Sequence, residues 1–372
     1  MRFCAICNEG FEDLVAEEVT RRTGSDAVMG KSYVSFECDS EKAILFAYLT
    51  QSAKKVMKIL SVFKAKDEAE IVKKAADIDY SSIHGSFCVR CSRHSIERDL
   101  GSSVYKRLAD PVVDMESPDY LIYFHWSSTR TSGAYDVVAG VDLTGIDLSK
   151  RSYKIFAHPS SIKGTLAYFL VALSGFDGNG QFLDPCSGSG TICAEAAYLA
   201  TGISPRFFDK DDIVRRSLDG RSLEPFLERY DESIDHETLR SLKNSISSYD
   251  VDLQAVNSAK KNLKIGGIDK FVSVAKGDID WLETKFEESS IDHIVSNPPA
   301  YSKYNQKKND KFFDKFFYQT EFVLSDTGKI VILTNSERPI SLSERYGLVP
   351  QIERRFMVGS SEMLILSFTK KH

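Results

Sequence analysis

Residues 181–192 have the sequence Gln-Phe-Leu-Asp-Pro-Cys-Ser-Gly-Ser-Gly-Thr-Ile. The short apolar run that ends at Leu183 predicts a buried parallel strand, which Asp184 closes. Gly188 and Gly190 allow a tight turn and a close approach of the backbone to a ligand. The apolar segment that follows predicts a helix whose first turn faces that ligand. A glycine-rich turn between a strand and a helix is typical of nucleotide-like cofactor sites in doubly wound sheets.

The turn departs from the fingerprint of dinucleotide-binding proteins. That fingerprint has a third glycine, where this chain has Cys193, and an acidic residue that ends a second strand about 20 residues further on. Asp209, Asp211 and Asp212 lie near that distance, but no clear strand leads into them. The glycine-rich turn therefore does not identify a dinucleotide site by itself.

A second motif follows further along the chain, where residues 292–299 have the sequence Asp-His-Ile-Val-Ser-Asn-Pro-Pro. The apolar part predicts a strand, in which His293 is expected to be structural. Two consecutive prolines cannot donate hydrogen bonds to a sheet, and they fix an extended exit from the strand. We therefore expect the Asn297 amide and the carbonyls beside the prolines at the carboxyl edge of the sheet. There they can accept hydrogen bonds from a planar exocyclic amine.

The composition is that of an ordinary globular protein. The 372 residues are enough for two or three domains, and 27% of them are charged and 42% hydrophobic. No apolar run approaches the roughly 18 residues that a membrane span needs, and the N-terminus does not resemble a secretory signal. Since the seven cysteines are an odd number in a chain without an export signal, we expect reduced thiols and a cytoplasmic location.

Two cysteine pairs, Cys4 with Cys7 and Cys88 with Cys91, have the spacing of zinc ligands. Both pairs lie on predicted strands, where residues three apart point to opposite faces of a sheet. A zinc ion shared by the two pairs would need both strands to bulge and to meet. We therefore favour buried thiols and expect no metal.

The pattern of apolar residues divides the chain into three parts. Residues 1–60 and residues 61–150 each mix strand and helix patterns, as small α+β units do. From residue 151 to residue 372 strands and helices alternate, which predicts βα units and a parallel sheet. In this third part, residues 158–161 (His-Pro-Ser-Ser) are expected to cap the first helix. Residues 203–247 form a long, charged insertion with poor periodicity.

Polar residues close four predicted strands of the third part: Asp184, Asp250, Asp278 and Asn297. A single Asp at a strand end is commonly a turn or a helix cap. Four such ends in this order resemble the class I methyltransferases, which use S-adenosyl-L-methionine. The resemblance implies that Asp184 accepts a hydrogen bond from the cofactor ammonium, Asp250 binds the ribose hydroxyls and Asp278 accepts from the adenine amine. Asn297 would then lie beside the methyl group.

The chain is similar nearly end to end to the THUMP-domain RNA guanine-N2 methyltransferases, which occur as archaeal tRNA enzymes and as part of bacterial 23S rRNA enzymes. The segments that carry this similarity are residues 10–18, 30–36, 86–93, 142–145, 148–154 and 158–159. The resemblance implies an α/β protein with three domains. These are a ferredoxin-like domain at residues 1–60, a THUMP RNA-binding domain at 61–150 and a Rossmann-like class I methyltransferase domain at 151–372.

The resemblance also implies the site residues. The expected catalytic residues are Asn297, Pro298, Pro299 and Tyr301. The Asn297 side-chain oxygen and the Pro298 carbonyl would accept hydrogen bonds from the amine of a base that has left its stack. The expected cofactor-binding residues are His158, Thr165, Asp184, Pro185, Cys186, Ser187, Gly188, Ser189, Gly190, Thr191, Asp250, Val251, Asp278, Ile279 and Asn297. The expected RNA-binding residues are Arg90, Arg93, Lys106, Arg107, Arg151, Lys303 and Lys307.

Two positions depart from the family's motifs. Ser187 stands where the family has Cys, and a Cys precedes it at position 186. Because both side chains are small, we expect cofactor binding to be preserved. The family also has Tyr or Phe directly after Asn-Pro-Pro, whereas this chain has Ala300 and then Tyr301. We expect Tyr301 to stack on the target base, and the alternatives are another aromatic residue or a different base.

The charge distribution bears on the partner. The net charge of −5 argues against nucleic-acid binding by the whole surface, but residues 54–107 contain twelve Lys or Arg against seven Asp or Glu. A second basic run spans residues 303–315. Each lysine alone also fits a solvated face, but together we interpret the two runs as contacts to RNA phosphates. The predicted function is S-adenosylmethionine-dependent guanine-N2 methylation of tRNA by a monomer.

Three alternatives stay open at this point. The first is guanine-N2 methylation of 23S rRNA. The second is adenine-N6 methylation of DNA or RNA, which also uses Asn-Pro-Pro with an aromatic residue, although the THUMP-like half argues against DNA. The third is a non-catalytic THUMP RNA-binding protein with a decayed methyltransferase domain, against which the intact Asp184, Gly188 and Gly190 argue.

Overall fold

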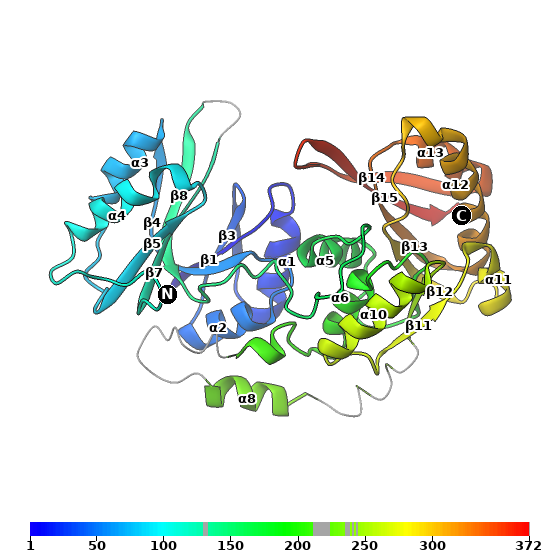
Figure 1. Cartoon of the computed structure of the whole chain (residues 1–372), viewed down its shortest axis with the longest axis horizontal. Coiled ribbons are helices and arrows are strands. Elements are labelled where there is room, and N and C mark those ends of the chain that lie inside the picture. Colours follow the sequence, from blue (N-terminus) through cyan, green and yellow to red (C-terminus); the bar gives the residue numbers. More distant parts are fainter. Residues whose placement is uncertain (129–132, 211–223, 235–238, 240–241, 243–244, 372) are drawn as a thin grey trace. The chain divides into compact units, whose positions relative to one another are not determined.

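The structure is a computed structural model of the chain, and it describes residues 1–128, 133–210, 224–234, 239, 242 and 245–371 (Figure 1). The chain divides into two compact units. The first unit comprises Met1–Leu148 with Asp209–Arg229, and the second comprises Ser149–Phe208 with Tyr230–His372. None of the helices among the described residues is long and apolar enough to cross a membrane.

The first unit contains an eight-stranded sheet in the order β2-β3-β1-β4-β8-β7-β5-β6. Its strands are β1 Arg2–Ile6, β2 Ala27–Gly30, β3 Tyr33–Glu37, β4 Lys55–Ala65, β5 Ser86–Cys91, β6 Val112–Val113, β7 Tyr120–Ser128 and β8 Tyr135–Asp142. On β4, Met57 is paired with Cys4 of β1 on one side and with Asp142 of β8 on the other. The sheet is therefore continuous across residue 60, and a domain boundary there stays a prediction.

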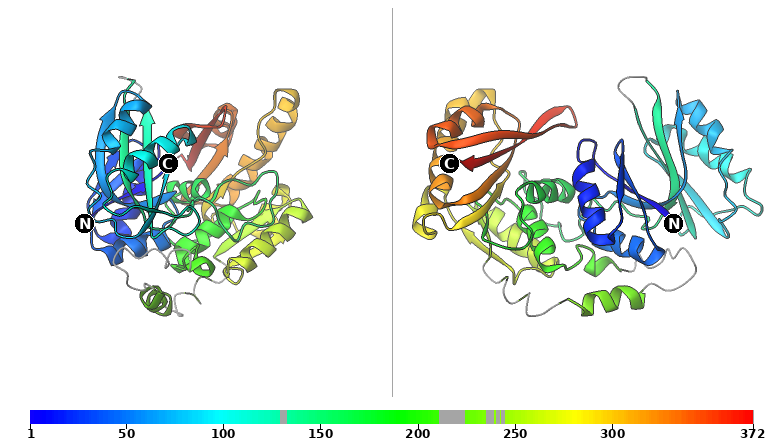
Figure 2. Two further views of the ribbon diagram at one scale, coloured as in Figure 1. Left: turned by 60° about the vertical axis from the view of Figure 1, so that its left-hand side comes forward. Right: turned by 180° about the vertical axis from the view of Figure 1, so that it is seen from behind.

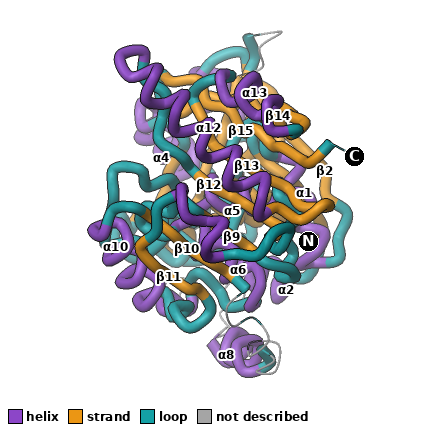
Figure 3. The backbone as a smooth tube through the Cα atoms, turned by 90° about the vertical axis from the view of Figure 1, so that its right-hand side faces the viewer, coloured by secondary structure: helices purple, strands orange, loops and turns teal. Residues whose placement is uncertain are grey.

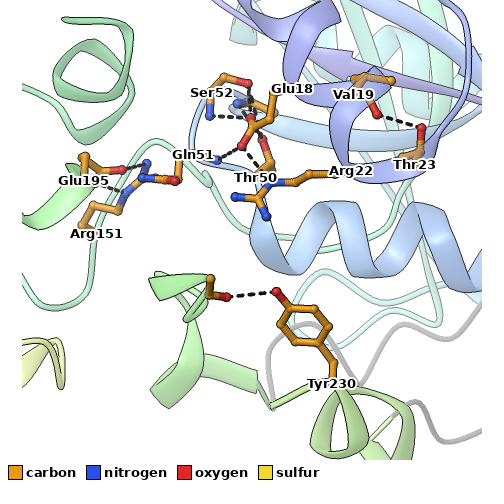
Figure 4. A network of polar contacts seen from close by, with 12 residues as sticks. Glu18, Val19, Arg22, Thr23, Thr50, Gln51, Ser52, Arg151, Glu195 and Tyr230 are labelled. Atoms are coloured by element: carbon orange, nitrogen blue, oxygen red, sulfur yellow. Dashed lines mark hydrogen bonds and ion pairs between the residues drawn. The ribbon is translucent and has the colours of Figure 1, made fainter. Parts of the chain in front are cut away.

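The helices of this sheet are α1 Glu12–Thr23, α2 Ser40–Leu49, α3 Glu68–Ala75 and α4 Glu97–Tyr105, with a 3₁₀ turn η1 at His94–Ile96. The buried Glu18 carboxylate of α1 accepts hydrogen bonds from Thr50 Oγ1 (2.7 Å), Gln51 N (3.0 Å) and Ser52 N (3.1 Å) (Figure 4). Burial opposes ionisation, but Arg22 and these donors hold the pKa of Glu18 below its ordinary value. Glu18 thereby ties α1 to the segment before β4.

The paired cysteines of this unit, Cys4, Cys7, Cys88 and Cys91, are buried free thiols. Burial raises the pKa of Cys4 and of Cys7 far above the ordinary value of a thiol. Within the described residues there is no group of three or more His, Cys, Asp or Glu side chains that could hold a metal ion.

The second unit contains a seven-stranded sheet in the order β11-β10-β9-β12-β13-β15-β14. Its strands are β9 Phe182–Asp184, β10 Ile246–Asp250, β11 Val272–Lys276, β12 Ile291–Ser296, β13 Leu324–Thr334, β14 Leu348–Val358 and β15 Ser361–Lys370. The five strands from β9 to β13 run parallel. The last two form a long antiparallel hairpin, visible in Figure 2, of which β15 joins β13. The parallel α/β pattern predicted for this part of the chain is confirmed.

The order of the strands determines where a ligand can bind. β9 lies between β10 and β12, so the chain leaves β9 toward one side of the sheet and later returns on the other. Open α/β sheets bind ligands at such a switch point, outside the carboxyl ends of the strands. Asp184 and Asn297 stand at the ends of the two strands that meet there.

The helices of the second unit connect these strands. They are α5 Gly164–Leu173, α6 Thr191–Thr201, α10 Leu253–Ile265, α11 Leu282–Lys285, α12 Gln306–Val323 and α13 Arg338–Ser343, while α8 Glu224–Glu232 spans the division between the units. The 3₁₀ turns are η2 Phe207–Asp209, η3 Ile279–Trp281, η4 Lys303–Asn305 and η5 Glu344–Tyr346. Figure 3 shows α12 lying across the sheet. Phe313, Phe316 and Phe317 of this helix belong to a hydrophobic core that also contains Ile294 and Ile330.

One detail of the sequence prediction needs revision. The first helix of this unit begins at Gly164 after Lys163, which makes no side-chain cap, so residues 158–161 do not cap it. Residues 158–161 instead form a loop against the glycine-rich turn, where Ser161 Oγ hydrogen bonds with Ser189 Oγ. Within the insertion predicted at 203–247, residues 211–223, 235–238, 240–241 and 243–244 lie outside the described residues.

Arg151, one of the predicted RNA-binding residues, is buried in an ion pair in this structure. Its side chain is 1% exposed, and its Nε and Nη2 donate to the Glu195 carboxylate at 2.8 and 3.0 Å. Tyr153 donates a third hydrogen bond to the same carboxylate (3.1 Å). Burial disfavours the charged guanidinium, but Glu195 outweighs it and raises the pKa of Arg151. The pair fixes the start of the second unit to α6 (Figure 4).

Arg151→Met is expected to lower the free energy of unfolding by about 3 kcal/mol, because it leaves the buried Glu195 carboxylate without its counter-charge. The double variant Arg151→Met/Glu195→Met removes both charges, so it is expected to recover most of the loss. The free energy of unfolding of both variants is measured by urea denaturation, which is followed by circular dichroism. A single variant as stable as the parent chain would show that the ion pair does not support the fold.

Candidate active site

A cavity of about 550 Å³ lies at the carboxyl edge of the parallel strands in the second unit. This volume falls within the range of about 300–1,000 Å³ that is usual for small-molecule sites. The cavity is lined by His158, Pro159, Ser160, Pro185, Cys186, Asp250, Val251, Asp252, Gly277, Asp278, Ile279, Asn297, Pro299, Lys308, Lys311, Phe312 and Lys315. The ends of β9, β10, β11 and β12 all contribute to it, as the switch point requires.

The glycine-rich turn supports one side of the cavity. Gly188 (φ +53°) and Gly190 (φ +79°) both have backbone conformations that side chains disfavour. A Cβ at Gly188 would overlap Ser160 Oγ, and one at Gly190 would lie 2.9 Å from the Cβ of Ala259 on α10. Both positions therefore need glycine for conformation and for space. The turn leads directly into α6, whose first residue is Thr191.

Asp184 is fully buried at the end of β9. Its Oδ1 accepts hydrogen bonds from Ser296 Oγ (2.7 Å) and Cys186 N (3.1 Å). Its Oδ2 has no partner among the described residues. Burial raises the pKa of Asp184 to about 7, against an ordinary value of 3.8. A buried carboxyl oxygen without a partner suits a cationic ligand, which would supply both the missing donor and the missing charge.

Asp250 and Asp278 line the cavity at the ends of the next two strands. Asp250 accepts from Gly188 N (2.8 Å) through Oδ2 and from Asp252 N (2.9 Å) through Oδ1, so it connects β10 to the glycine-rich turn. Asp278 accepts from Asp280 N (3.2 Å) and caps η3. Each carboxylate oxygen can accept further hydrogen bonds besides these. The cap role and a ligand-binding role are therefore compatible.

The amide group of Asn297 is oriented by the loop at residues 158–161. Asn297 Nδ2 donates to Ser160 O at 2.8 Å, which leaves Oδ1 as the acceptor for another donor. His158 holds the same loop, because its Nδ1 lies 2.7 Å from Ser160 Oγ and its Nε2 lies 3.5 Å from Asp252 Oδ2. The sequence prediction missed Ser160 and Asp252, whose contributions depend on the tertiary fold.

Some of the predicted cofactor-binding residues line the cavity, and the others are buried outside its lining. The cavity lining includes His158, Pro185, Cys186, Asp250, Val251, Asp278, Ile279 and Asn297. The predicted residues outside the lining are Thr165, Asp184, Ser187, Gly188, Ser189, Gly190 and Thr191. All of these are buried. Thr165 Oγ1 and Ser187 Oγ are also buried without a partner among the described residues.

Among the predicted catalytic residues, Asn297 and Pro299 line the cavity, whereas Pro298 is buried and Tyr301 is not in the lining. The Tyr301 ring is stacked on Phe313 with centroids 5.1 Å apart and planes at 14°. The role of Tyr301 on the target base stays a prediction.

The predicted RNA-binding residues differ in their surroundings. In the first unit, Arg90 pairs with Glu97 (3.1 Å) and Arg93 lies near Glu68 (3.8 Å). Lys106 and Arg107 of the same unit are exposed. In the second unit Lys307 is exposed but does not line the cavity, and the side chain of Lys303 lies outside the described part of the structure.

One wall of the cavity is a face of α12, whose lysines the sequence prediction assigned to RNA phosphates and whose phenylalanine it did not name. Lys308, Lys311, Phe312 and Lys315 are spaced as i, i+3, i+4 and i+7, which places them on one side of a helix. Lys315 pairs with Asp280 of η3. The helical spacing of a phenylalanine among lysines was visible in the sequence, but only the structure shows that this face borders the cavity.

The comparisons with known proteins agree with this geometry. Residues 151–357 match the model of a family described as RMKL-like, methyltransferase domain. This chain belongs to that family. Among its curated relatives is the ribosomal RNA large subunit methyltransferase K/L of Vibrio parahaemolyticus, 23% identical over 321 residues, covering 80% of this chain and 44% of that protein. The tRNA (guanine(6)-N2)-methyltransferase of Methanocaldococcus jannaschii is 27% identical over 229 residues, covering 61% and 57%. The chain thus spans about half the length of the curated relatives it matches.

Solved structures share the fold of this RMKL-like chain. SMU.472, a putative methyltransferase complexed with SAH, has a TM-score of 0.76 at 20% identity and covers 100% of this chain and 98% of its own. TrmN from Thermus thermophilus has a TM-score of 0.67 at 20% identity, covering 100% and 99%. These structures confirm the predicted α/β fold, and the family match confirms the methyltransferase domain. The ferredoxin-like and THUMP assignments stay predictions.

Proposed function

We propose that this RMKL-like chain is an S-adenosylmethionine-dependent RNA methyltransferase that modifies the exocyclic N2 amine of guanine in tRNA. One observation carries the proposal. The buried Asp184, with an unpartnered Oδ2, and Asn297, with a free acceptor oxygen, stand at adjacent strand ends. Asn297 and the residue after Asp184, Pro185, both line the cavity. Asp184 suits a cationic methyl donor, and Asn297 suits an amine that receives the methyl group.

The cofactor is proposed to occupy the part of the cavity between the glycine-rich turn and the ends of β10 and β11. Asp184 Oδ2 would accept from its ammonium group, Asp250 from its ribose hydroxyls and Asp278 from its adenine amine. The absence of side chains at Gly188 and Gly190 keeps the turn close to the loop at residues 158–161 and to α10. When bound, S-adenosylmethionine would supply an electrophilic methyl group on a sulfonium.

The target amine is proposed to bind at Asn297. The Oδ1 of Asn297 and the carbonyl of Pro298 would accept the two amine hydrogens, and this would turn the nitrogen lone pair toward the methyl group. The hydrogen bond from Asn297 Nδ2 to Ser160 O pre-orients this acceptor, so less ordering is needed at the reaction step. The base has to leave its stack to reach a pocket at a sheet edge. No strong general base is required, since the proton can leave after the methyl transfer.

The choice of tRNA over rRNA is also part of the proposal. Relatives whose names specify tRNA and rRNA both align with this chain, and the alignment with the rRNA enzyme covers less than half of that protein. In the proposal, the predicted THUMP domain at residues 61–150 docks the RNA through exposed cations such as Lys106 and Arg107.

The test is methyl transfer from labelled S-adenosylmethionine into unmodified bulk tRNA, 23S rRNA and duplex DNA, followed by nucleoside analysis. N2-methylguanosine in tRNA is the expected product. N2-methylguanosine in rRNA alone would keep the reaction and change the substrate. N6-methyladenosine, or no transfer despite measurable S-adenosylhomocysteine binding, would overturn the proposal in favour of an adenine enzyme or a non-catalytic RNA-binding protein.

A further inference from the structure

We infer that the α12 face formed by Lys308, Lys311 and Phe312 binds the target nucleotide, with the Phe312 ring stacking on the base and the two lysines pairing with phosphates. This inference rests on the proposed function and adds the residues that hold its substrate.

The position of this face follows from the packing of α12. Phe313, Phe316 and Phe317 are fully buried against the sheet, and they fix the rotation of the helix. The residues one step earlier, Phe312 and Lys315 among them, then border the cavity that also contains Asn297. Phe312 is half-buried, and its ring makes a T-shaped contact with Phe313 (centroids 5.4 Å apart) and a tilted contact with Phe316 (6.1 Å). The side chain is therefore held by the core and still lines the cavity.

The start of α12 is held next to the Asn-Pro-Pro segment. Asn309 Nδ2 donates to Ala300 O (3.4 Å), which ties the first turn of the helix to the chain just after Pro299. Pro299, Lys308 and Phe312 all line the cavity. A base stacked on Phe312 would thus lie next to the proposed acceptors of its amine.

Tyr301 is not available for this stacking role in the structure. Its ring lies against Phe313, and its hydroxyl donates to Asp310 Oδ1 (3.3 Å). Asp310 also pairs with Arg338 (3.1 Å). The Tyr301 backbone is bound at both polar groups by the Asn335 amide, at 2.8 and 3.0 Å. The residue displaced by one position after Asn-Pro-Pro is therefore a structural support, and Phe312 is the aromatic ring in the cavity lining.

The charges beside Phe312 favour a nucleotide over the adenine of the cofactor. Lys308 and Lys311 are exposed and have no carboxylate partner within the described residues, whereas Lys315, one turn further on, is paired with Asp280. S-adenosylmethionine carries one carboxylate beside its ammonium and sulfonium groups and has no phosphate, so it offers an anionic partner to one lysine at most. A nucleotide of RNA has a flat base for the ring and phosphates for the cations.

The first experiment compares Phe312→Leu, which keeps an apolar side chain on Phe313, with Phe312→Tyr, which restores an aromatic face. Phe312→Leu is expected to lower kcat/KM for RNA by about 10- to 100-fold, because a stacking ring is lost, while the affinity for S-adenosylhomocysteine is unchanged. Phe312→Tyr is expected to retain most of the activity. Tyr318→Leu, an exposed aromatic of the same helix outside the cavity, is the matched control.

The second experiment tests the lysines through the salt dependence of RNA binding. Lys308→Ala/Lys311→Ala is expected to reduce the slope of log Kd against log salt by about 1.4, the value for two phosphates of a single strand. Lys264→Ala, an exposed lysine in the last turn of α10, is expected to leave the slope unchanged.

A third measurement does not depend on methyl transfer. Binding of guanosine 5′-monophosphate to the protein saturated with S-adenosylhomocysteine is followed by ligand-observed NMR, and Phe312→Leu is expected to weaken it. If the parent chain transfers no methyl group to RNA, this measurement still decides the inference. An equal loss of S-adenosylhomocysteine affinity in Phe312→Leu would assign the ring to the cofactor and overturn the inference. A larger loss of kcat/KM in Tyr301→Leu than in Phe312→Leu would overturn it as well.

Discussion

Asn297→Ala is expected to lower kcat for methyl transfer by about 10³-fold, with little change in the affinity for S-adenosylhomocysteine. The variant removes the proposed acceptor of the target amine. It also removes the Nδ2 donor that fixes the amide against Ser160 O (2.8 Å). Both losses act on the alignment of the amine with the methyl group, so the effect belongs to the chemical step. Single-turnover methyl transfer into RNA measures it directly, and calorimetry measures cofactor binding.

Two further variants test the interpretation of the Asn297→Ala result. Asn297→Asp keeps an acceptor oxygen but loses the donor to Ser160, so its activity is expected to be as low as that of the alanine variant. His293→Gln is the control on the same strand, because His293 Nδ1 lies 3.0 Å from Ser174 O and the residue does not line the cavity. An Asn297→Ala enzyme with at least about one tenth of the parent rate would remove Asn297 from the mechanism.

Asp184→Asn is expected to weaken S-adenosylhomocysteine binding about 100-fold, because the ammonium group of the ligand loses a buried counter-charge. The parent chain is expected to bind more tightly as the pH rises toward 7, since only the ionised form of Asp184 attracts the ammonium group and burial raises its pKa to about 7. Above pH 7 the gain levels off. Calorimetric titrations between pH 5.5 and 8.5, a range chosen to bracket that value, follow both effects.

The same carboxyl group is expected to lower the free energy of unfolding of the ligand-free protein as the pH rises. This is opposite to its effect on cofactor affinity, which increases with pH. The pKa of Asp184 is about 7 in the folded chain and 3.8 when unperturbed, so the folded state holds the proton more tightly. The resulting stabilisation is fully present below pH 3.8 and is lost as the pH rises through 7, in total about 4 kcal/mol.

Urea unfolding at pH 5 and pH 8 measures this loss of stability, because the two pH values lie on either side of the folded-state pKa of Asp184, about 7. Because Asp184→Asn cannot ionise at this position, the difference between the two pH values should be smaller in the variant than in the parent chain. Equal differences in both proteins would show that Asp184 is ionised in the folded protein across this range. Saturation with S-adenosylhomocysteine should offset the loss at pH 8, since the ammonium group stabilises the ionised form.

The polar residues of the site were predictable because of a property of parallel sheets. The carboxyl ends of neighbouring parallel strands meet at one edge, so residues that close such strands in the sequence converge in space. Asp250, Asp278 and Asn297 follow this rule and line one cavity. Asp184 follows it as well, but it lies below the surface, and its unpartnered oxygen could not have been inferred from the sequence.

Other features depend on packing that a single sequence does not reveal. The family resemblance placed Arg151 among the RNA-binding residues, but its partner Glu195 lies 44 residues away and both side chains are buried. The choice between Tyr301 and Phe312 depends on the rotation of α12, which the buried phenylalanines fix only in the folded state. The boundary predicted at residue 60 falls inside β4, whose lysines interrupt the alternation of apolar and polar residues.

Because β4 pairs with both β1 and β8, it limits where the chain can be cut into expression fragments. A fragment that begins at residue 61 would start inside an 11-residue strand that pairs with β1 on one side and β8 on the other. Its N-terminal half would be missing, and β8 would lose partners for Gly140, Val141 and Asp142. Unpaired edges of this kind recruit other chains and cause aggregation. Expression fragments should therefore not be divided within residues 1–148, which belong to one compact unit together with Asp209–Arg229.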